Sequence, residues 1–552
     1  MQPKTVDTYT QYPPRTRCSR WIALVLMLCI SLAVSGVSAQ DGPTFELTVM
    51  HTNDTRANHL PPSDGNGGAA RQATIVKQIR AEVENSILVD AGGRFTGTLF
   101  HRKFKGTDNV QVMNLMGYQA MTLGNPEFDD GDDVLRNFIE GLNFPVVSSN
   151  IDARNSVLAD LIKPYVLLEV GESKEQLGII GLTPAETPRL SSPSKDIIFS
   201  GGYAAAVQRQ VELLKGQGIN KIILLSQLGY TDDQTLAAQI SGVDIIVGGN
   251  SRIVLSNLYT SAVGPYPTVV QSAAGEPVLI VQSGGGELRY MGRLDVTFDA
   301  NGVITDWSGD NILMSRYIPP DPEMQALIDG LTAEVQALRE ETIQTLAGAD
   351  AVANAEIAFV DCRITECPIG NLVADALRAE SGAQIAIMNG GGIRAAIDAG
   401  NITVGEVFTV LPFDNLLATF TLRGSDVLAA LENGLSRLGA ESGTGRFAQV
   451  SGLRYVYTPN APIGKRVLSV EVLNADGTFT PLDPDALYTV ASNDFLRGGG
   501  DGYEMFATSA IDAYDAGRPI AEVLIDYIAL KSPIEPIMDG RIKPDPSVEI
   551  KP

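Results

Sequence analysis

The stretch ELTVMHTND, residues 46–54, decides the fold together with the two segments that follow it. It is a short apolar run that ends in polar residues, which predicts a buried strand leading into a loop. ARQATIVKQIRAEV (70–83) repeats apolar residues at helical spacing, and SILVDAGG (86–93) is again a short apolar run ending in glycines. The face of the expected helix carries Ile75, Val76, Ile79 and Val83. Strand, helix and strand in this order predict a layered α/β domain.

The same pattern continues through the first half of the chain. Further runs that predict buried strands are FPVVSSNID (144–152), LGIIGLTP (177–184), KIILLSQLGY (221–230) and VDIIVGG (243–249). Each leads into a polar or glycine-rich turn, and α/β folds assemble their sites from the loops at strand ends. The polar residues that we expect to converge in such loops are Asp54, Asp90, Asn125, Gln227, Asn250 and Arg252.

A proline-led segment separates two α/β regions. PPDPEMQALIDGLTAEVQALREE (319–341) predicts a helix, which we interpret as the linker between two domains. The apolar stripe of this helix is Met324, Leu327, Ile328, Leu331, Val335 and Leu338. The second region then opens with a helix, IGNLVADALRAE (369–380), and a strand, QIAIMNGGG (384–392), and later holds the glycine-rich turn RGGGDGY (497–503).

The N-terminus has the order of a processing signal. Arg15, Arg17 and Arg20 precede the apolar run WIALVLMLCISLAV, which ends in the small residues of SGVSAQ. This order predicts a cleavable signal over residues 1–39 and an exported protein, periplasmic or extracellular, with a membrane anchor as the alternative. No other segment of the sequence is long and apolar enough to cross a bilayer, so we expect no transmembrane span after signal removal.

The charge of the chain excludes two classes of partner. Its formal net charge is −24, and loss of residues 1–39 removes four basic residues and one acidic residue, which brings the charge to −27. A chain this acidic repels nucleic acid and anionic membranes, so neither is an expected partner. An anionic small molecule would have to be held by a local cluster of cations.

Two of the four cysteines remain after signal removal. Cys18 and Cys29 lie in the signal, whereas Cys362 and Cys367 lie in the stretch CRITEC. In an exported protein this spacing favours a small disulfide-closed loop. A metal-binding pair is the alternative, although no histidine or third cysteine lies nearby to complete a zinc site.

Many short motifs, in one order, make the chain resemble the secreted 5′-nucleotidase family of UDP-sugar hydrolase/5′-nucleotidase type, over roughly residues 45 to 545. In the first half they are HTND, GGAAR, DAG, MGYQAMTLGNPEFD, SSNI, GLTPAET and DIIVGG. In the second half they are CRITECPIGNLVADALR, NGGGIR, VLPFDN, QVSGLRY and NDFLRGGGDGY. The resemblance implies an α/β (α+β) fold in three parts. These are a four-layer metallophosphoesterase-type sandwich over 41–318, a linker helix over 319–346 and a second α/β nucleotide-binding domain over 347–545.

In that family the first domain holds two divalent metal ions of the Zn or Mn type, which polarise a phosphoryl group and activate a water. Their ligands are an Asp-x-His pair, the Asp of a Gly-Asp dipeptide, the Asn of Gly-Asn-His-Glu and histidines of two later loops. Here only Asp54 and Asn125 match this pattern. The other ligand positions hold Arg56, Gly93, Gln227, Asn250 and Arg252. The position of the catalytic histidine is Pro126, although its acidic companion Asp129 remains.

The histidine count agrees with a dismantled site. Of the three histidines, His51 lies within the first expected strand, three residues before Asp54, whereas His59 and His101 lie outside the motif positions. A dinuclear site needs anionic ligands between two dications, so we predict that no metal is bound tightly. A weak site for a hard cation, built from the oxygens of Asp54, Asn125, Gln227 and Asn250, is the alternative.

The arginines admit two interpretations. Guanidinium groups bind phosphate oxygens in a bidentate fork, so Arg56 and Arg252 could form a metal-free anion pocket. The other interpretation pairs Arg56 with Asp54 and leaves Arg252 facing solvent. Neither arrangement supplies an activated water.

The second domain keeps the residues that the resemblance assigns to nucleotide binding. Two aromatics of the family sandwich the base, and they correspond to Phe413 and Phe495. The ribose and phosphate contacts correspond to Arg363, Asn389, Arg394 and Asp501, with close backbone approach at Gly391 and Gly392. The Cys362–Cys367 pair matches a family disulfide, which would brace the loop that carries Arg363.

The sequence therefore predicts an exported member of this family that binds a nucleoside or nucleotide and has lost, or nearly lost, metal-dependent hydrolysis. One alternative is a working phosphoesterase of nucleotide catabolism with a rewired site. Another is a scaffold or interaction protein with a remnant pocket, whose protein partner the sequence does not reveal.

Overall fold

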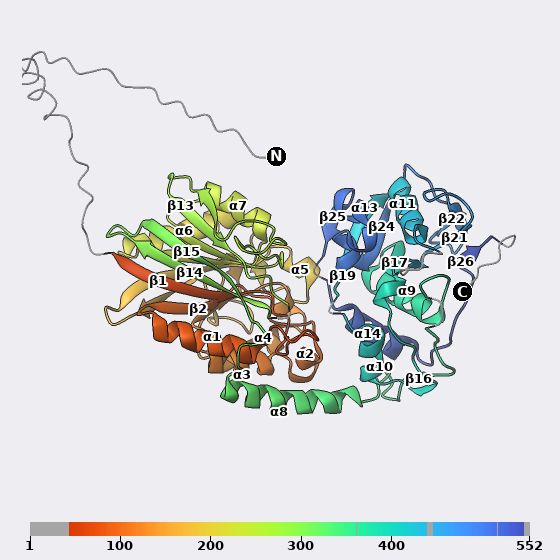
Figure 1. Cartoon of the computed structure of the whole chain (residues 1–552), viewed down its shortest axis with the longest axis horizontal. Coiled ribbons are helices and arrows are strands. Elements are labelled where there is room, and N and C mark those ends of the chain that lie inside the picture. Colours follow the sequence, from red (N-terminus) through yellow and green to blue (C-terminus); the bar gives the residue numbers. More distant parts are fainter. Residues whose placement is uncertain are drawn as a thin grey trace, which may run out of the picture. The chain divides into compact units, whose positions relative to one another are not determined.

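The computed structural model describes residues 44–286, 288–359, 362–413, 415–438, 445–515 and 517–545, without the side chain of Arg189. The expected signal, with Cys18 and Cys29, lies outside these ranges. The chain from Phe45 to Pro552 belongs to a single structural unit. Within it the described residues form a mixed α/β fold of two domains, as the sequence predicts (Figure 1). Among the described residues, no helix has the length and apolar character that a membrane span requires.

Two sheets form the centre of the first domain. The first sheet has the order β15-β14-β1-β2-β3-β4-β6, in which β1, β2, β3, β4 and β6 run parallel and β14 and β15 are antiparallel. Its strands are β1 (Phe45–Thr52), β2 (Ser86–Asp90), β3 (Ala120–Thr122), β4 (Val146–Val147), β6 (Ile162–Lys163), β14 (Tyr290–Phe298) and β15 (Ile304–Leu313). The second sheet has the order β12-β13-β11-β10-β8-β7. Its strands are β7 (Tyr165–Val170), β8 (Glu175–Leu182), β10 (Ile222–Ser226), β11 (Ile245–Gly248), β12 (Thr268–Gln271) and β13 (Pro277–Val281).

Helices cover the outer faces of both sheets, which gives the expected four layers (Figure 1). The first sheet is covered by α1 (Ala69–Glu82), α3 (Thr107–Met116) and α4 (Asp132–Gly141), and the second by α6 (Tyr203–Gly216) and α7 (Tyr230–Gln239). Between the sheets lies one apolar core, to which β1 contributes Val49 and β10 contributes Leu225, both fully buried. Because β1, β2 and β3 run parallel in the first sheet, and β10 and β11 run parallel in the second, the polar residues that follow each set of strands lie at one edge of its sheet.

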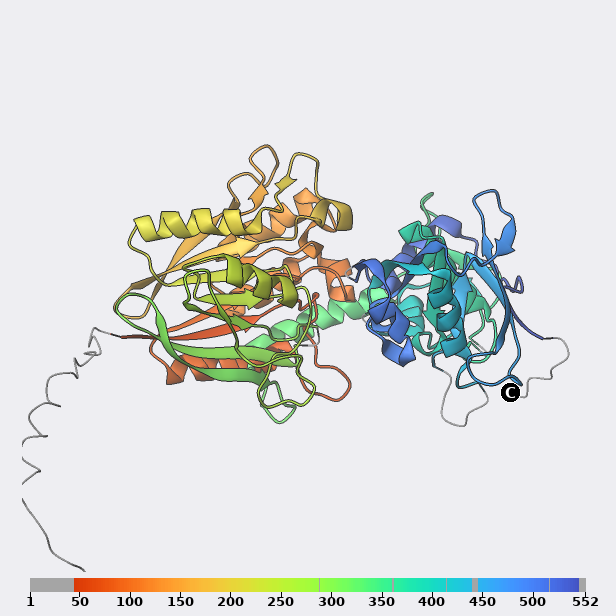
Figure 2. The same cartoon turned by 90° about the horizontal axis from the view of Figure 1, so that it is seen from above.

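Helix α8 (Pro322–Arg339) connects the two halves of the chain and begins where its prolines predict. Asp321 caps it by accepting a hydrogen bond from the Met324 backbone N–H at 3.1 Å. The buried stripe is the expected one except for Leu327, which is only partly buried: Met324, Ile328, Leu331, Val335 and Leu338. The helix contacts α1, α2 (Leu99–Phe104) and α3 of the first domain and α10 (Val404–Val410) of the second. Figure 2 shows α8 in green along this course.

The second domain holds a five-stranded and a four-stranded sheet. The order of the five-stranded sheet is β20-β17-β24-β19-β25, with β17 (Ile385–Asn389), β19 (Leu417–Arg423), β20 (Ala448–Ser451), β24 (Leu487–Asn493) and β25 (Ile511–Tyr514). The order of the four-stranded sheet is β23-β22-β21-β26, with β21 (Leu453–Tyr457), β22 (Val467–Leu473), β23 (Phe479–Pro481) and β26 (Ile542–Pro544). The main helices are α9 (Pro368–Ser381), α11 (Gly424–Leu435), α12 (Asp494–Arg497) and α14 (Ile520–Lys531). The expected helix at 369–380 and strand at 384–392 are therefore α9 and β17. The boundaries 41–318, 319–346 and 347–545 stay predictions.

Candidate functional site

Loops at the carboxyl ends of five strands meet at one edge of the first domain. They follow β1, β2 and β3 of one sheet and β10 and β11 of the other. Gln227, after β10, donates from Nε2 to Asp54 Oδ1, after β1, at 2.9 Å. The backbone N–H of Asp54 donates to Gly92, after β2, at 2.8 Å. Asp90 does not join this cluster, because its carboxylate accepts a hydrogen bond from Arg94 at 2.6 Å in a separate buried pair.

The Asp54 carboxylate is fully buried and its two oxygens face amide groups. Oδ1 accepts from Gln227, and Oδ2 accepts from Asn53 Nδ2 at 2.8 Å. Burial raises the pKa of Asp54, while the charges of Arg56 and Arg252 and these hydrogen bonds act in the opposite direction. Within the described part of the chain both side-chain hydrogen bonds to Asp54 come from amides, so the interpretation that pairs it directly with Arg56 is not what the structure shows.

Close packing fills the space beside Asp54. A Cβ atom at Gly93 would lie 2.5 Å from Asp54 Oδ1, and one at Gly249 would lie 2.3 Å from Gln227 Nε2. The φ of Gly93 is +78°, which also disfavours any other residue. An aspartate at this position would have to displace Asp54, so the present packing and a second carboxylate exclude each other.

Arg56 is a buried cation whose donors are largely unused. Its side chain is 4% exposed and lines a large cavity, and neither Nε nor Nη1 has a hydrogen-bond partner among the described residues. Its φ is +52°, in the left-handed region that costs a residue with a Cβ about 1–2 kcal/mol. Its backbone N–H donates to Gly93 O at 3.0 Å, which holds the loop in this conformation.

Arg252 pairs with the second domain and does not simply face solvent. Its Nη1 lies 3.2 Å from the Asp494 carboxylate, and its side chain is 28% exposed. Arg252 and its neighbour Asn250 both have positive φ, +52° and +66°. Burial raises the pKa of Asp494, and the positive charge of Arg252 opposes that shift.

The motif around Pro126 forms a rigid support. Pro126 opens a short 3-10 turn, Pro126–Phe128, and the buried Glu127 carboxylate accepts hydrogen bonds from four backbone N–H groups. These N–H groups belong to Gly93, Arg94, Phe95 and Gly124. The frame therefore joins the loops after β2 and β3. Asn125 donates to the Tyr514 hydroxyl at 3.3 Å, and Asp129 accepts from Ser191 at 2.6 Å.

All three histidines are engaged away from the cluster. His51 is hydrogen-bonded to Tyr266 at 2.8 Å, and burial lowers its pKa to about 3. His59 contacts Asp108 at 2.7 Å, and His101 contacts Asp130 at 2.5 Å. Among the described residues there is no group of three or more His, Cys, Asp or Glu side chains placed to hold a metal ion.

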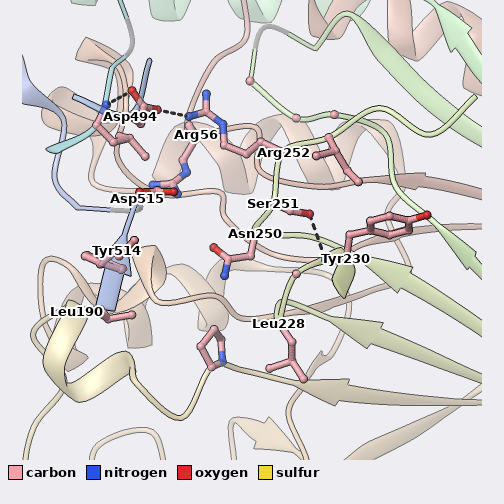
Figure 3. Close-up of a pocket in the computed structure, with 18 of the residues that line it drawn as sticks. Arg56, Leu190, Leu228, Tyr230, Asn250, Ser251, Arg252, Asp494, Tyr514 and Asp515 are labelled. Carbon is pink, nitrogen blue, oxygen red and sulfur yellow. Dashed lines mark hydrogen bonds and ion pairs between the residues drawn. The ribbon is translucent and has the colours of Figure 1, made fainter. Parts of the chain in front are cut away.

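One cavity of about 1160 Å³ joins the cluster to the second domain (Figure 3). From the first domain it is lined by Arg56, Asn250 and Arg252, and from the second by Phe413 and Phe495. Figure 3 shows Arg56, Arg252 and Asp494 grouped on one side of it. The two residues expected to sandwich the base thus share a cavity with three of the positions that the resemblance assigns to metal ligands.

The remaining nucleotide-binding candidates also belong to the second domain. The Arg394 guanidinium lies 5.7 Å from the centre of the Phe413 ring. Asn389 donates to Asp501 at 2.8 Å, and the Gly391 backbone N–H donates to Gly445 O at 2.7 Å. Gly392 follows in the 3-10 turn after β17. Arg363 lies partly buried in the disulfide loop, and its Nε has no hydrogen-bond partner among the described residues. Their roles toward a ligand stay predictions.

Cys362 and Cys367 form the disulfide that the sequence favoured over a metal pair, with Cα atoms 5.0 Å apart. Gln449 fastens the same loop by donating to the carbonyl groups of Cys362 at 2.8 Å and Thr365 at 2.7 Å.

Several cavity residues are absent from the sequence expectations. They include Glu186, Tyr230, Asp494, Tyr514 and Asp515. Asp494 carried a signal, because it lies beside Phe495 within the motif NDFLRGGGDGY. Glu186 lies within the motif GLTPAET and Tyr230 ends the run KIILLSQLGY, but neither stretch singled out these residues as part of a site. Tyr514 and Asp515 come from the end of β25 and the loop after it, where the local sequence has no distinctive pattern.

Comparison with known proteins shows which family the chain belongs to. The family model described as "5'-nucleotidase, C-terminal domain" matches residues 345–508. The chain is 35% identical to the snake venom 5′-nucleotidase of Naja atra over 90% of this chain and 98% of that protein. It is also 35% identical to the trifunctional nucleotide phosphoesterase protein YfkN of Bacillus subtilis, over 90% of this chain but only 35% of that much longer protein.

Solved structures extend the comparison. A 5′-nucleotidase precursor of Thermus thermophilus is 38% identical, with a TM-score of 0.59 over 91% of this chain and 99% of that one. The NAD nucleotidase of Haemophilus influenzae is 28% identical, with a TM-score of 0.75 over 91% and 100%. With its two-domain α/β fold and its likeness to full-length relatives, the chain belongs to the 5′-nucleotidase family.

Proposed function

We propose that this chain binds a nucleoside or nucleotide through its C-terminal domain, and that metal-dependent phosphoester hydrolysis in its N-terminal domain is lost or strongly impaired. The proposed loss of hydrolysis is supported by the hydrogen bonding of the Asp54 carboxylate. Its carboxylate is the only one left among the family's ligand positions, and both oxygens accept hydrogen bonds from amides. A metal ion would have to replace those amides.

The two divalent ions used by the family do not fit this donor set. Dinuclear sites need carboxylates that bridge or flank two dications. Here Arg56 and Arg252 bring positive charge to ligand positions, and Gly93 brings no side chain. The packing at Gly93 leaves no room for a second carboxylate. We therefore derive no hydrolytic step through a metal for this chain.

The binding half of the proposal rests on the aromatics. Phe413 and Phe495 are each 47% exposed and line the same cavity. Apolar rings left half exposed in a concave site are typical of ligand-binding surfaces, and flat rings stack well on nucleobases. Relatives that span this chain are named 5′-nucleotidases, which favours a nucleoside or nucleotide as the ligand.

We place the mature protein outside the cytoplasm, because residues 1–39 have the order of a cleavable signal. N-terminal sequencing of the protein recovered from the periplasmic or culture fraction tests this. A mature start near Gln40 supports export, and an intact Met1 in the cytosolic fraction contradicts it.

A working hydrolase with a rewired site is the second candidate. Asn125 Oδ1 and Gln227 Oε1 are buried without a hydrogen-bond partner among the described residues, and amide oxygens are ligands for hard cations. Metal analysis of the purified protein, combined with a phosphate-release assay in Mn²⁺ or Zn²⁺, decides between the two. Turnover of about 1 per second or more that EDTA abolishes would overturn the proposed loss of activity.

A scaffold with a remnant pocket is the third candidate. Isothermal titration of the mature protein with AMP, adenosine and UDP-glucose tests it directly. Saturable heat with any of them supports ligand capture, whereas no heat with all of them refutes the binding proposal.

A further inference from the structure

We propose that Arg56 and Arg252 form a metal-independent binding site for a phosphate group, on the side of the cavity where the family carries its metals. The proposal deepens the proposed nucleotide capture and rests on it for the identity of the ligand. The chemical class of the ligand is a phosphate monoester or diester carried by a nucleoside. The site selects phosphorylated ligands without hydrolysing them.

Arg56 supplies the first observation. Its side chain is more than nine-tenths buried, yet it lines the cavity, and Nε and Nη1 have no partner within the described structure. A buried guanidinium without hydrogen bonds is costly, because it has lost its water and gained no replacement. These two donors lie on different edges of the planar guanidinium, so each is available for a hydrogen bond to a phosphate oxygen.

Arg252 supplies a second cation on the same side of the cavity. Its only ion pair among the described residues is with Asp494, through Nη1, and its side chain remains 28% exposed. Gly284, Gly285 and Gly286 line the cavity next to it, and a Cβ atom at Gly286 would lie 3.5 Å from Arg252 Nη2. The absence of side chains on this loop leaves the guanidinium open to a ligand.

The positive charge of this site is confined to the two arginines, because carboxylates line other parts of the cavity. The cavity is also lined by Glu186, Asp232, Asp494 and Asp515. Asp515 forms an ion pair with Arg497 at 3.2 Å, whereas Asp494 forms an ion pair with Arg252 itself. A phosphate that binds both arginines therefore competes with Asp494. This competition gives the proposal a signature of its own, because removal of the Asp494 charge should strengthen phosphate binding.

The position of the site suits a nucleotide. Phe413 and Phe495 line the same cavity, whose volume of about 1160 Å³ slightly exceeds that of ordinary small-molecule pockets, about 300–1,000 Å³. A ligand stacked on the aromatics can direct its phosphate toward the arginines. Asp494 lies next to Phe495 in the chain, so one short segment carries both a base contact and the competitor for Arg252.

The test uses the mature protein in EDTA and inorganic phosphate as the probe, measured by isothermal titration. Arg56→Gln and Arg252→Gln each remove a guanidinium, and we expect each to weaken phosphate binding at least about tenfold. Asp494→Asn keeps an acceptor for the Leu416 backbone N–H, and we expect it to tighten phosphate binding. Arg154→Gln is the matched control, because Arg154 is exposed, pairs only with Asp152 among the described residues and does not line the cavity.

Thermal unfolding of each variant shows whether it folds. If Arg56→Gln does not fold, Arg252→Gln and Asp494→Asn still decide the matter. Absence of phosphate binding by the unaltered protein, or equal affinity in all folded variants, would overturn the proposal. Adenosine separates it from the proposed function. Adenosine binding without phosphate binding refutes only the arginine site, whereas phosphate binding without adenosine or AMP binding refutes nucleotide capture and leaves the arginine site standing.

Discussion

Gln227 Nε2 donates a hydrogen bond to Asp54 Oδ1 at 2.9 Å, so an amide N–H contacts an oxygen of the carboxylate that the resemblance assigns to a metal ligand. Asn53 does the same on Oδ2. These contacts explain how the buried carboxylate is accommodated, because hydrogen bonds offset part of the desolvation cost. The side chains of the cluster therefore pack against one another and satisfy the Asp54 carboxylate by hydrogen bonds.

This packing predicts that restored histidines will not restore the metal centre. In a variant carrying Arg56→His, Gln227→His, Asn250→His and Arg252→His, four nitrogen ligands return, but Gly93 still provides no carboxylate. A Cβ atom there would lie 2.5 Å from Asp54 Oδ1. We expect at most one zinc ion per chain by elemental analysis, and no EDTA-sensitive phosphate release. Two ions per chain would contradict the packing argument.

Truncation of either exposed phenylalanine should weaken nucleoside binding. Phe413→Ala and Phe495→Ala each remove one stacking face, and stacking of a base on an aromatic ring contributes about 1–3 kcal/mol. We expect adenosine affinity to fall by about tenfold or more in each variant, measured by isothermal titration. Tyr317→Ala is the control, because Tyr317 is 80% exposed and does not line the cavity. Equal losses in all three variants would show that the effect is not stacking.

Much of the fold follows from local patterns in the sequence. The strands at β1, β2, β8, β10 and β11 and the helices α1, α8 and α9 lie where apolar periodicity and prolines place them, because burial of one face decides such elements. The contact between Arg252 and Asp494 does not follow in this way. The two residues are 242 positions apart, and their pairing depends on the tertiary arrangement of both domains.

The contacts of Glu127 could not be predicted from the sequence either, although Glu127 lies inside a recognised motif. The sequence GNPEFD drew attention to the missing histidine, whereas the buried Glu127 accepts four backbone hydrogen bonds that join two loops. No spacing rule reveals such a contact, since its donors are backbone groups of any residue. The motif frame is retained because the loops depend on this carboxylate, whether or not a metal is present.

Removal of the disulfide should destabilise the second domain. The bond between Cys362 and Cys367 closes a loop of a few residues, for which the chain-entropy estimate is about 2 kcal/mol. We expect the double variant Cys362→Ala/Cys367→Ala to unfold at lower urea concentration, followed by circular dichroism. Gln449 still holds the loop through two carbonyl groups, so the variant should remain folded without urea. An unchanged midpoint would show that Gln449 alone suffices.

Asp233 should make the protein less stable as the pH rises. Its carboxyl group is fully buried in α7 beside Ser226, and burial raises its pKa to about 8 from 3.8. Between these values the folded chain keeps a proton that the unfolded chain has lost, so this group lowers the free energy of unfolding by about 1.4 kcal/mol per pH unit.

Asp233→Asn removes this titration while retaining an oxygen that accepts from Ser226. We therefore expect the variant to match the unaltered protein near pH 4 and to become progressively more stable than it up to pH 8. Urea unfolding at a series of pH values measures the difference. Ser194→Ala is the control for the effect of a substitution as such, because Ser194 is exposed and distant from Asp233 in the sequence. A difference between variant and parent that stays constant from pH 4 to 8 would show that Asp233 ionises normally in the folded protein.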